Sequence, residues 1–172
     1  MKNPFSFLKS KDSGIKAKNP EFGIKDSEKL KIDEMPDENY KAAKISDIGL
    51  ADPLALQGVV VLKSDDGREF PLSAFSGEVA RYISNFIEQR RDSIPTIYNM
   101  FEQVCEESEL LLVKVKLYDS GEALRANLYF TGKKDLVLRN FRASDAIALA
   151  TFYNAPILVR KELLKENVTV KQ

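Results

Sequence analysis

The sequence of 172 residues contains no histidine and a single cysteine. Without histidine, the chain lacks the side chain that most often exchanges protons near neutral pH and most often binds transition metals. Zinc sites built from cysteine and histidine and serine–histidine–aspartate triads are therefore excluded. The groups left for chemistry are carboxylates, arginine, lysine, tyrosine and hydroxyls. They suit a hard divalent cation such as Mg²⁺ or Mn²⁺, and we expect neither a zinc site nor an organic cofactor.

Net charge and long hydrophobic runs are absent as well. The 26 basic and 26 acidic side chains give a formal net charge of zero, so any contact with nucleic acid must be local. No apolar run is long enough to span a bilayer, and the N-terminal residues lack the apolar core of a signal peptide. The single Cys105 cannot form an intramolecular disulfide and suits a reducing compartment. We therefore expect a cytoplasmic protein with no membrane partner.

The first 39 residues differ in composition from the rest of the chain. They are rich in lysine, acidic residues, glycine and proline, and their apolar residues follow no sustained period. Such a segment buries too little apolar surface to offset the entropy lost on ordering. We predict a charged, flexible N-terminal tail over residues 1–39 and one domain over residues 40–172.

After Pro36 the apolar residues become periodic, and turn sequences separate the periodic segments. Asp65-Asp66-Gly67 and Asp119-Ser120-Gly121-Glu122 each predict a β-hairpin. Helices are predicted after Ser76, after Pro95 and after Ser144; the second carries an apolar stripe of Ile97, Met100, Phe101 and Val104. Strands are predicted over residues 40–50, 56–63, 68–72, 110–118, 123–131, 136–139 and 157–159. This order predicts an α+β domain whose mixed, largely antiparallel sheet has helices packed across it.

The segment FRASDAIALATFYNAPILV, residues 141–159, predicts a helix that leads into a buried strand. We expect Ser144 to cap the helix and Asn154 and Pro156 to end it. Arg142, Ser144 and Asp145 would then surround an outward-facing helix N-terminus. Free N–H groups, a hydroxyl and a guanidinium there can hold a phosphate, and a Mg²⁺ ion can bridge Asp145 to it. The alternative is that Ser144 only caps, Asp145 favours the helix dipole and Arg142 pairs with a neighbouring carboxylate.

The hairpin over residues 110–131 has one apolar and one polar face. A buried side is predicted for Val113, Val115, Leu117, Leu124, Ala126, Leu128 and Phe130, and an outer side for Lys114, Lys116, Tyr118, Arg125, Asn127 and Tyr129. With a four-residue loop, Lys116 is predicted opposite Arg125, and opposed like charges require an anion nearby. The anion is either a nucleic-acid phosphate, with Tyr118 and Tyr129 available for stacking, or a carboxylate from the tail or a second subunit. The remaining alternative is a fully hydrated face.

Several of these segments together carry a family likeness. VVVLKSDDGREFPL, then Glu78, Pro95 and the segment FRASDAIALATFYNAPILV resemble the bifunctional nuclease family in order and spacing over residues 40–164. The resemblance implies an α+β fold and cleavage of DNA and RNA. Ile97-Tyr98-Asn99 stands where the family usually has threonine-histidine-aspartate, and Ala143 stands where it has proline.

Combining the residues with the resemblance gives a leading hypothesis of a phosphodiester hydrolase that uses a divalent cation. Asp145 and Glu78, which matches the family's helix acid, are predicted as catalytic metal ligands, with Arg142 as the phosphate clamp. Asp65 or Asp66 could add a third acid, although we interpret both as turn residues. Substrate-binding residues are predicted to be Ser144, Lys116, Arg125 and Tyr129. The alternative is a non-catalytic, homo-oligomeric binding module that recognises an anionic ligand, nucleic acid or a protein partner.

Overall fold

The computed structural model describes residues 37–90 and 95–166, so most of the predicted N-terminal tail lies outside the described residues. The elements in chain order are η1 (Asp37–Asn39), β1 (Tyr40–Leu50), β2 (Gln57–Ser64), β3 (Glu69–Ser76), α2 (Gly77–Ile87), α3 (Ile97–Glu107), β4 (Leu111–Asp119), β5 (Leu124–Thr131), β6 (Leu136–Arg142), α4 (Ala143–Tyr153), β7 (Ile157–Arg160) and η2 (Lys161–Leu163). None of these helices is long and apolar enough to cross a membrane.

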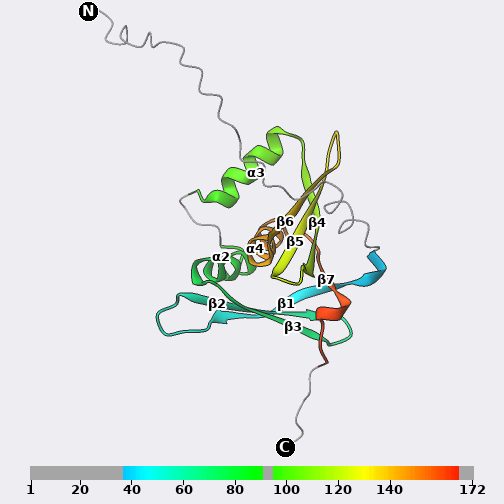
Figure 1. Ribbon diagram of the computed structural model, residues 1–172. Helices are drawn as coiled ribbons and strands as arrows, with labels where there is room; N and C mark the ends of the chain where they lie inside the picture. The colour runs from blue at the N-terminus through cyan, green and yellow to red at the C-terminus, as the bar shows by residue number, and fades with distance from the viewer. Residues whose placement is uncertain (1–36, 91–94, 167–172) are drawn as a thin grey trace, which may run out of the picture.

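One seven-stranded sheet organises the domain, in the order β3-β2-β1-β7-β4-β5-β6. Within it, β4 and β7 pair in parallel and the other neighbouring strands pair antiparallel. The sheet curls: in Figure 1, β1–β3 lie below while β4–β6 stand upright, and α2 and α4 occupy the angle between them. The predicted α+β fold with a mixed, largely antiparallel sheet is confirmed.

The core lies between the sheet and the two central helices. Side chains that point to this side of the sheet, such as Val60, Leu62, Val115 and Leu117, are at most 1% exposed. Helix α4 is surrounded by protein, and its buried residues are distributed around the whole helix rather than along one stripe. Its alanines allow the neighbouring elements to approach closely. The position of α4 therefore fixes its N-terminus relative to α2 and β6.

The register of the β4–β5 hairpin differs from the prediction. Lys116 pairs with Asn127, and Arg125 pairs with Tyr118. The turn spans Ser120 to Ala123, one residue later than predicted, because the Gly121 N–H donates to Asp119 Oδ1 and the Ser120 N–H donates to the Ala123 carbonyl. Moving the turn by one residue changes every cross-strand partner by two. The predicted pairing of Lys116 with Arg125 is therefore wrong.

The two faces of this hairpin are also less distinct than predicted. An irregularity between Leu112 and Lys114 interrupts the alternation, so that Leu112 is buried and Val113 is 37% exposed. On the predicted outer face, Lys116, Tyr118 and Asn127 are buried. Lys114, Arg125 and Tyr129 on the same face are only partly exposed, so the face is not fully open to water.

The start of α4 is different from the prediction as well. Arg142, in extended conformation, is the N-cap residue, and its side chain makes no capping hydrogen bond. Ser144 lies inside the first turn and is buried, because β6 continues without a loop to Arg142 and places the N-cap there, two residues earlier than predicted. The predicted cap at Ser144 is wrong. The predicted helix end is confirmed, since Asn154 adopts the left-handed conformation with φ 54°.

Helix α3 packs through a different side than predicted. Its buried residues are Tyr98 and Cys105, whereas Ile97, Met100 and Val104 are between 55% and 61% exposed. Aromatic contacts hold the helix in this orientation: the Tyr98 ring lies 5.0 Å from that of Phe86, and Phe101 lies 5.9 Å from Phe130. Most of the predicted apolar stripe therefore faces away from the core.

Candidate functional site

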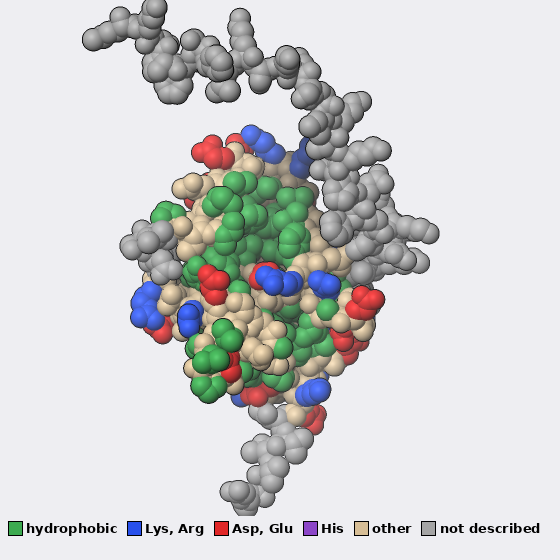
Figure 2. Space-filling model, turned by 60° about the vertical axis from the view of Figure 1, so that its left-hand side comes forward, with side chains coloured by type: hydrophobic (Ala, Val, Ile, Leu, Met, Phe, Trp, Pro, Cys, Tyr) green, Lys and Arg blue, Asp and Glu red, His purple; other side chains and the backbone are tan. Residues whose placement is uncertain are grey.

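The three residues predicted to be catalytic, Glu78, Arg142 and Asp145, line one pocket of about 560 Å³. The pocket lies where α2, α3, α4, β5 and β6 meet. Its other lining residues are Val79, Tyr82, Ile97, Tyr98, Phe101, Leu128, Leu138, Phe141, Ala146 and Leu149. In Figure 2, hydrophobic side chains gather over the upper part of the visible face, and acidic and basic side chains follow their lower border. Apart from Glu78, Arg142 and Asp145 the lining is apolar or aromatic, and Glu78 and Arg142 are exposed, so the pocket has a mainly apolar wall and a charged rim.

Arg142 and Asp145 form a two-pronged ion pair at this rim. Arg142 Nε donates to Asp145 Oδ2 at 2.7 Å, and Arg142 Nη2 donates to Asp145 Oδ1 at 3.0 Å. The hydrogen bond to Asp145 and its negative charge raise the pKa of Arg142. The Arg142 side chain is 69% exposed, so its outer N–H groups remain accessible to a second anion. This ion pair is the contact that the alternative, non-catalytic interpretation of the sequence predicted for Arg142.

Glu78 reaches the same pocket from the first turn of α2. Ser76 caps this helix by accepting a hydrogen bond from the Glu78 N–H at 3.2 Å, as predicted. Asp145 occupies the equivalent place in the first turn of α4. The N-termini of two helices, each with one acidic residue, therefore lie on one pocket. Their partial positive charges favour anionic groups there.

The donors at this rim restrict the metals that it can hold. Over residues 37–90 and 95–166, no group of three or more acidic or cysteine side chains is arranged to hold a metal ion. Asp145 and Glu78 supply only oxygen atoms, and Arg142 already contacts both oxygens of Asp145. Mg²⁺ and Mn²⁺ bind proteins through one or two carboxylates and complete their coordination with water and substrate phosphate, so this rim could contribute at most Glu78 and Asp145 to such an ion.

The aromatic wall was not predicted as part of a site. Tyr98 is buried, and its ring lies 5.3 Å from that of Tyr82 in an edge-to-face contact. Burial, followed by the negative charge of Asp145, raises the pKa of Tyr98 to about 12. The available signal was the spacing of Tyr98, Phe101 and Cys105, which also lie on one helical face. The prediction followed the stripe from Ile97 to Val104 instead, because that stripe is more hydrophobic than the face with Tyr98 and Cys105.

The other predicted substrate-binding residues lie elsewhere. Ser144 is buried and does not line the pocket. Arg125 pairs with Arg142 across the β5–β6 ladder, next to the rim but not among the lining residues. Lys116 and Tyr129 belong to a separate cluster on the opposite face of the sheet. Glu78, Asp145 and Arg142 therefore line one pocket, whereas Lys116 and Tyr129 lie on the other face of the sheet.

We call the separate group the lysine cluster; it consists of Asp37, Tyr40, Lys114, Lys116 and Tyr129. The Asp37 carboxylate lies 2.7 Å from Lys114 Nζ and 2.5 Å from Lys116 Nζ. Lys116 Nζ also lies 4.9 Å from the centre of the Tyr40 ring and 5.2 Å from that of Tyr129. Hydrogen bonds from the two lysines lower the pKa of Asp37. The anion predicted for this face is therefore a carboxylate from the end of the tail.

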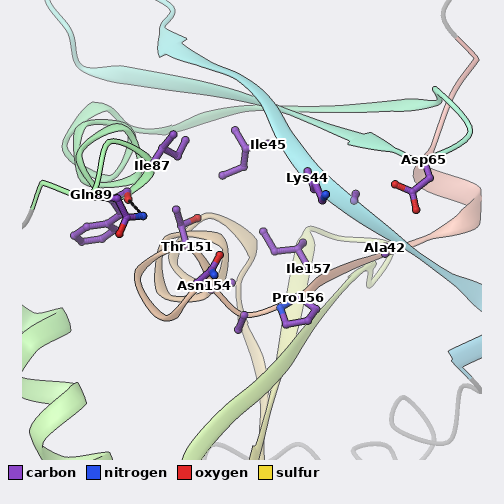
Figure 3. Close-up of a pocket in the computed structure, with 14 residues that line it drawn as sticks. Ala42, Lys44, Ile45, Asp65, Ile87, Gln89, Thr151, Asn154, Pro156 and Ile157 are labelled. Atoms are coloured by element: carbon purple, nitrogen blue, oxygen red, sulfur yellow. Dashed lines mark hydrogen bonds between the residues drawn. The ribbon is translucent and has the colours of Figure 1, made fainter.

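Asp65 and Asp66 do not join the acidic rim. Asp66 pairs with Lys41 and Arg68, and these hydrogen bonds lower its pKa. Asp65 lines a second pocket of about 530 Å³ between β1 and the C-terminal ends of α2 and α4. Figure 3 shows Asp65 on the opposite side of this pocket from Gln89, with Lys44 between them. This pocket contains none of the residues predicted to be catalytic.

A family model described as the bifunctional nuclease domain matches residues 60–172, which is more than half of the chain. No curated protein matches the sequence. The matched range includes every residue that lines the pocket with the charged rim. The chain belongs to the bifunctional nuclease domain family.

Proposed function

We propose that this member of the family hydrolyses phosphodiester bonds of DNA or RNA at the charged rim, with the help of a divalent cation. The observation that carries the proposal is the meeting of Glu78, Arg142 and Asp145 on one pocket, although more than sixty residues of sequence separate Glu78 from the other two. The family description supports a nuclease-like function in general terms.

In this proposal each rim residue has a defined task. The outer N–H groups of Arg142 bind a non-bridging phosphate oxygen, which aligns the scissile bond. Glu78 accepts a proton from the attacking water through a carboxylate oxygen. Asp145 holds Arg142 in place and, together with Glu78, supplies the carboxylates for the cation. When bound, Mg²⁺ or Mn²⁺ would lower the pKa of the water and stabilise charge on the leaving oxygen.

The test is a cleavage assay with the full-length protein on single-stranded and duplex DNA and RNA, in Mg²⁺, in Mn²⁺ and in chelator. Asp145→Asn and Glu78→Gln should each reduce the cleavage rate by about 100-fold or more, the usual loss when a positioned acid or base is removed. Chelator should abolish cleavage in the wild-type protein.

The matched control is Glu88→Gln, at the C-cap of the same helix as Glu78, where the carboxylate pairs with Arg90 instead. This variant should cleave at the wild-type rate. Cleavage that survives chelator, or that is unaffected by both rim substitutions, would contradict the proposed chemistry. Circular dichroism of each variant would show whether a loss of rate reflects loss of folding.

A second candidate function, a homo-oligomeric binding module, is favoured by the exposed apolar side of α3. Ile97, Met100 and Val104 lie on it, and Leu111 at the start of β4 is 59% exposed. Exposed apolar surface of this kind commonly marks an interaction site. Sedimentation analysis should then show an assembly that Met100→Lys dissociates. A wild-type protein that sediments as a monomer would reject this candidate.

A further inference from the structure

The pocket beside the charged rim combines an aromatic and aliphatic lining with charged groups at one edge. Four aromatic rings, those of Tyr82, Tyr98, Phe101 and Phe141, line it together with aliphatic side chains. Its volume of about 560 Å³ lies within the usual range for small-ligand sites, roughly 300–1,000 Å³. Phe141 is 46% exposed and Ile97 is 61% exposed, so apolar surface at its mouth faces water.

The charged groups of the pocket lie on its rim rather than around its wall. Glu78 and Asp145 come from the first turns of α2 and α4, and Arg142 caps α4. The aromatic side chains come from α2, α3 and the end of β6. A nucleotide has this same division, because its base is planar and largely apolar on its faces while its phosphate is charged.

We propose that the pocket binds one unpaired nucleobase, which stacks on the aromatic wall while its phosphate lies at Arg142. The inference rests on the proposed function and specifies its substrate: single-stranded DNA or RNA, or a nucleotide turned out of a duplex. A base inside a duplex cannot enter, since both of its faces are stacked on neighbouring bases. Every base has a π face, so the site takes bases without strong sequence preference.

The charge distribution supports single strands over intact duplexes. Binding of a duplex depends on several phosphate contacts from lysine and arginine. The pocket rim offers one arginine and two carboxylates, and the chain as a whole has zero formal charge. Most of the binding energy must therefore come from stacking and apolar contact, which an unpaired base supplies.

The experiment measures binding separately from cleavage. Full-length protein in Mg²⁺ is titrated into fluorescein-labelled phosphorothioate oligonucleotides, which resist hydrolysis, and fluorescence anisotropy gives the affinity. The probes are a DNA oligothymidine, an RNA oligouridine, an abasic strand of the same backbone and length, and a duplex. The base-bearing strands should bind, whereas the abasic strand and the duplex should bind at least about 5-fold more weakly, the lower bound for one stacked base.

Substitution of Phe141 tests the aromatic wall directly. Phe141→Ala should weaken binding of the base-bearing strand by about 5- to 150-fold and leave binding of the abasic strand unchanged. Phe141→Trp keeps an aromatic ring and should retain wild-type affinity. The control is Leu136→Ala at the other end of β6, which removes an exposed apolar side chain that does not line the pocket. It should bind as the wild-type protein does.

Equal affinity for base-bearing and abasic strands would overturn the inference, as would tighter binding of the duplex. It would also be overturned if Phe141→Ala dissociated an oligomer without changing affinity for the oligonucleotide, since a second copy would then cover the pocket. Base-dependent binding without cleavage of ordinary oligonucleotides would support the pocket and reject the proposed hydrolysis. Cleavage of ordinary oligonucleotides, together with binding that does not depend on the base, would support the proposed hydrolysis and reject the inference about the pocket.

Discussion

Asp37→Asn is expected to destabilise the domain through the lysine cluster. The substitution keeps the shape of the side chain but removes the charge that lies between Lys114 and Lys116. Lys116 is the sensitive partner, because its side chain is 6% exposed whereas that of Asp37 is 58% exposed. The variant therefore leaves a nearly buried ammonium group without its carboxylate.

The loss of unfolding free energy in Asp37→Asn should lie between two limits. Exposed ion pairs contribute about 0.2–1 kcal/mol, and removal of one partner from a buried pair costs about 3–5 kcal/mol. Water reaches Asp37 and screens the pair, and the Tyr40 and Tyr129 rings still face Lys116 Nζ, so we expect a loss of about 1–2 kcal/mol. With a urea dependence of about 2 kcal/mol per molar, the unfolding midpoint should fall by about 0.5–1 M.

The assay is urea unfolding followed by circular dichroism at several pH values. The pKa of Asp37 is lowered below its usual 3.8 in the folded state, so the pair stabilises the protein above that pH and this contribution is lost as the pH falls further. The difference in unfolding free energy between wild type and variant should be constant between about pH 5 and pH 8, where carboxylates and lysines are both charged, and shrink towards zero below pH 3.8.

The control is Glu109→Gln, which breaks the exposed pair with Lys133 and should cost less than about 1 kcal/mol. Lys116→Met offers a second check, because an apolar side chain of similar length removes the buried charge. In that background Asp37→Asn should cost no more than an exposed pair. If Asp37→Asn costs no more than Glu109→Gln in the wild-type background, or if its effect persists in strong acid, the reasoning is refuted.

Two further predictions concern packing and titration. Gly77→Ala should destabilise the domain by about 1–3 kcal/mol in the same unfolding assay, because the added Cβ would lie 2.0 Å from the Ala55 carbonyl oxygen. The control is Gly49→Ala, because its Cβ would meet only Val59, at 3.8 Å. Tyr98, with its pKa raised from 10.0 to about 12, stays protonated in the folded state after the unfolded chain has lost its proton. The wild-type protein should therefore lose stability relative to Tyr98→Phe as the pH rises from 10 to 12, and equal slopes for the two proteins would contradict this.

The sequence predicted the elements well because their signals are local. Alternation defined the strands, Ser76 capped α2, and Asn154 ended α4 in the left-handed conformation. The errors occurred where two neighbouring positions offer similar chemistry. The β4–β5 turn closes one residue later than predicted, and the N-cap of α4 is Arg142, two residues before the predicted Ser144. A shift of one or two residues leaves the sequence pattern almost unchanged, but a shifted turn changes the cross-strand partners of a whole strand.

The orientation of α3 shows a different limit. Three of the four residues in its predicted apolar stripe, Ile97, Met100 and Val104, are exposed. The fourth, Phe101, packs with Tyr98 on the other side of the helix, where both rings find aromatic partners on α2, α4 and β5. Hydrophobicity along one helix does not reveal the shape of the surface on which it packs. For this reason the sequence did not predict that these aromatic residues form one wall of a pocket.

The sequence by itself determined which chemistry is available: without histidine and with one cysteine, carboxylates, arginine, lysine, tyrosine and hydroxyls remain. It also determined the α+β class, since periodicity is a property of neighbouring residues. Only the tertiary structure decided that Glu78, Arg142 and Asp145 share one pocket and that Lys116 pairs with Asp37. These contacts join residues far apart in the chain, and their geometry depends on the curl of the sheet and the packing of all its helices, which no local pattern encodes.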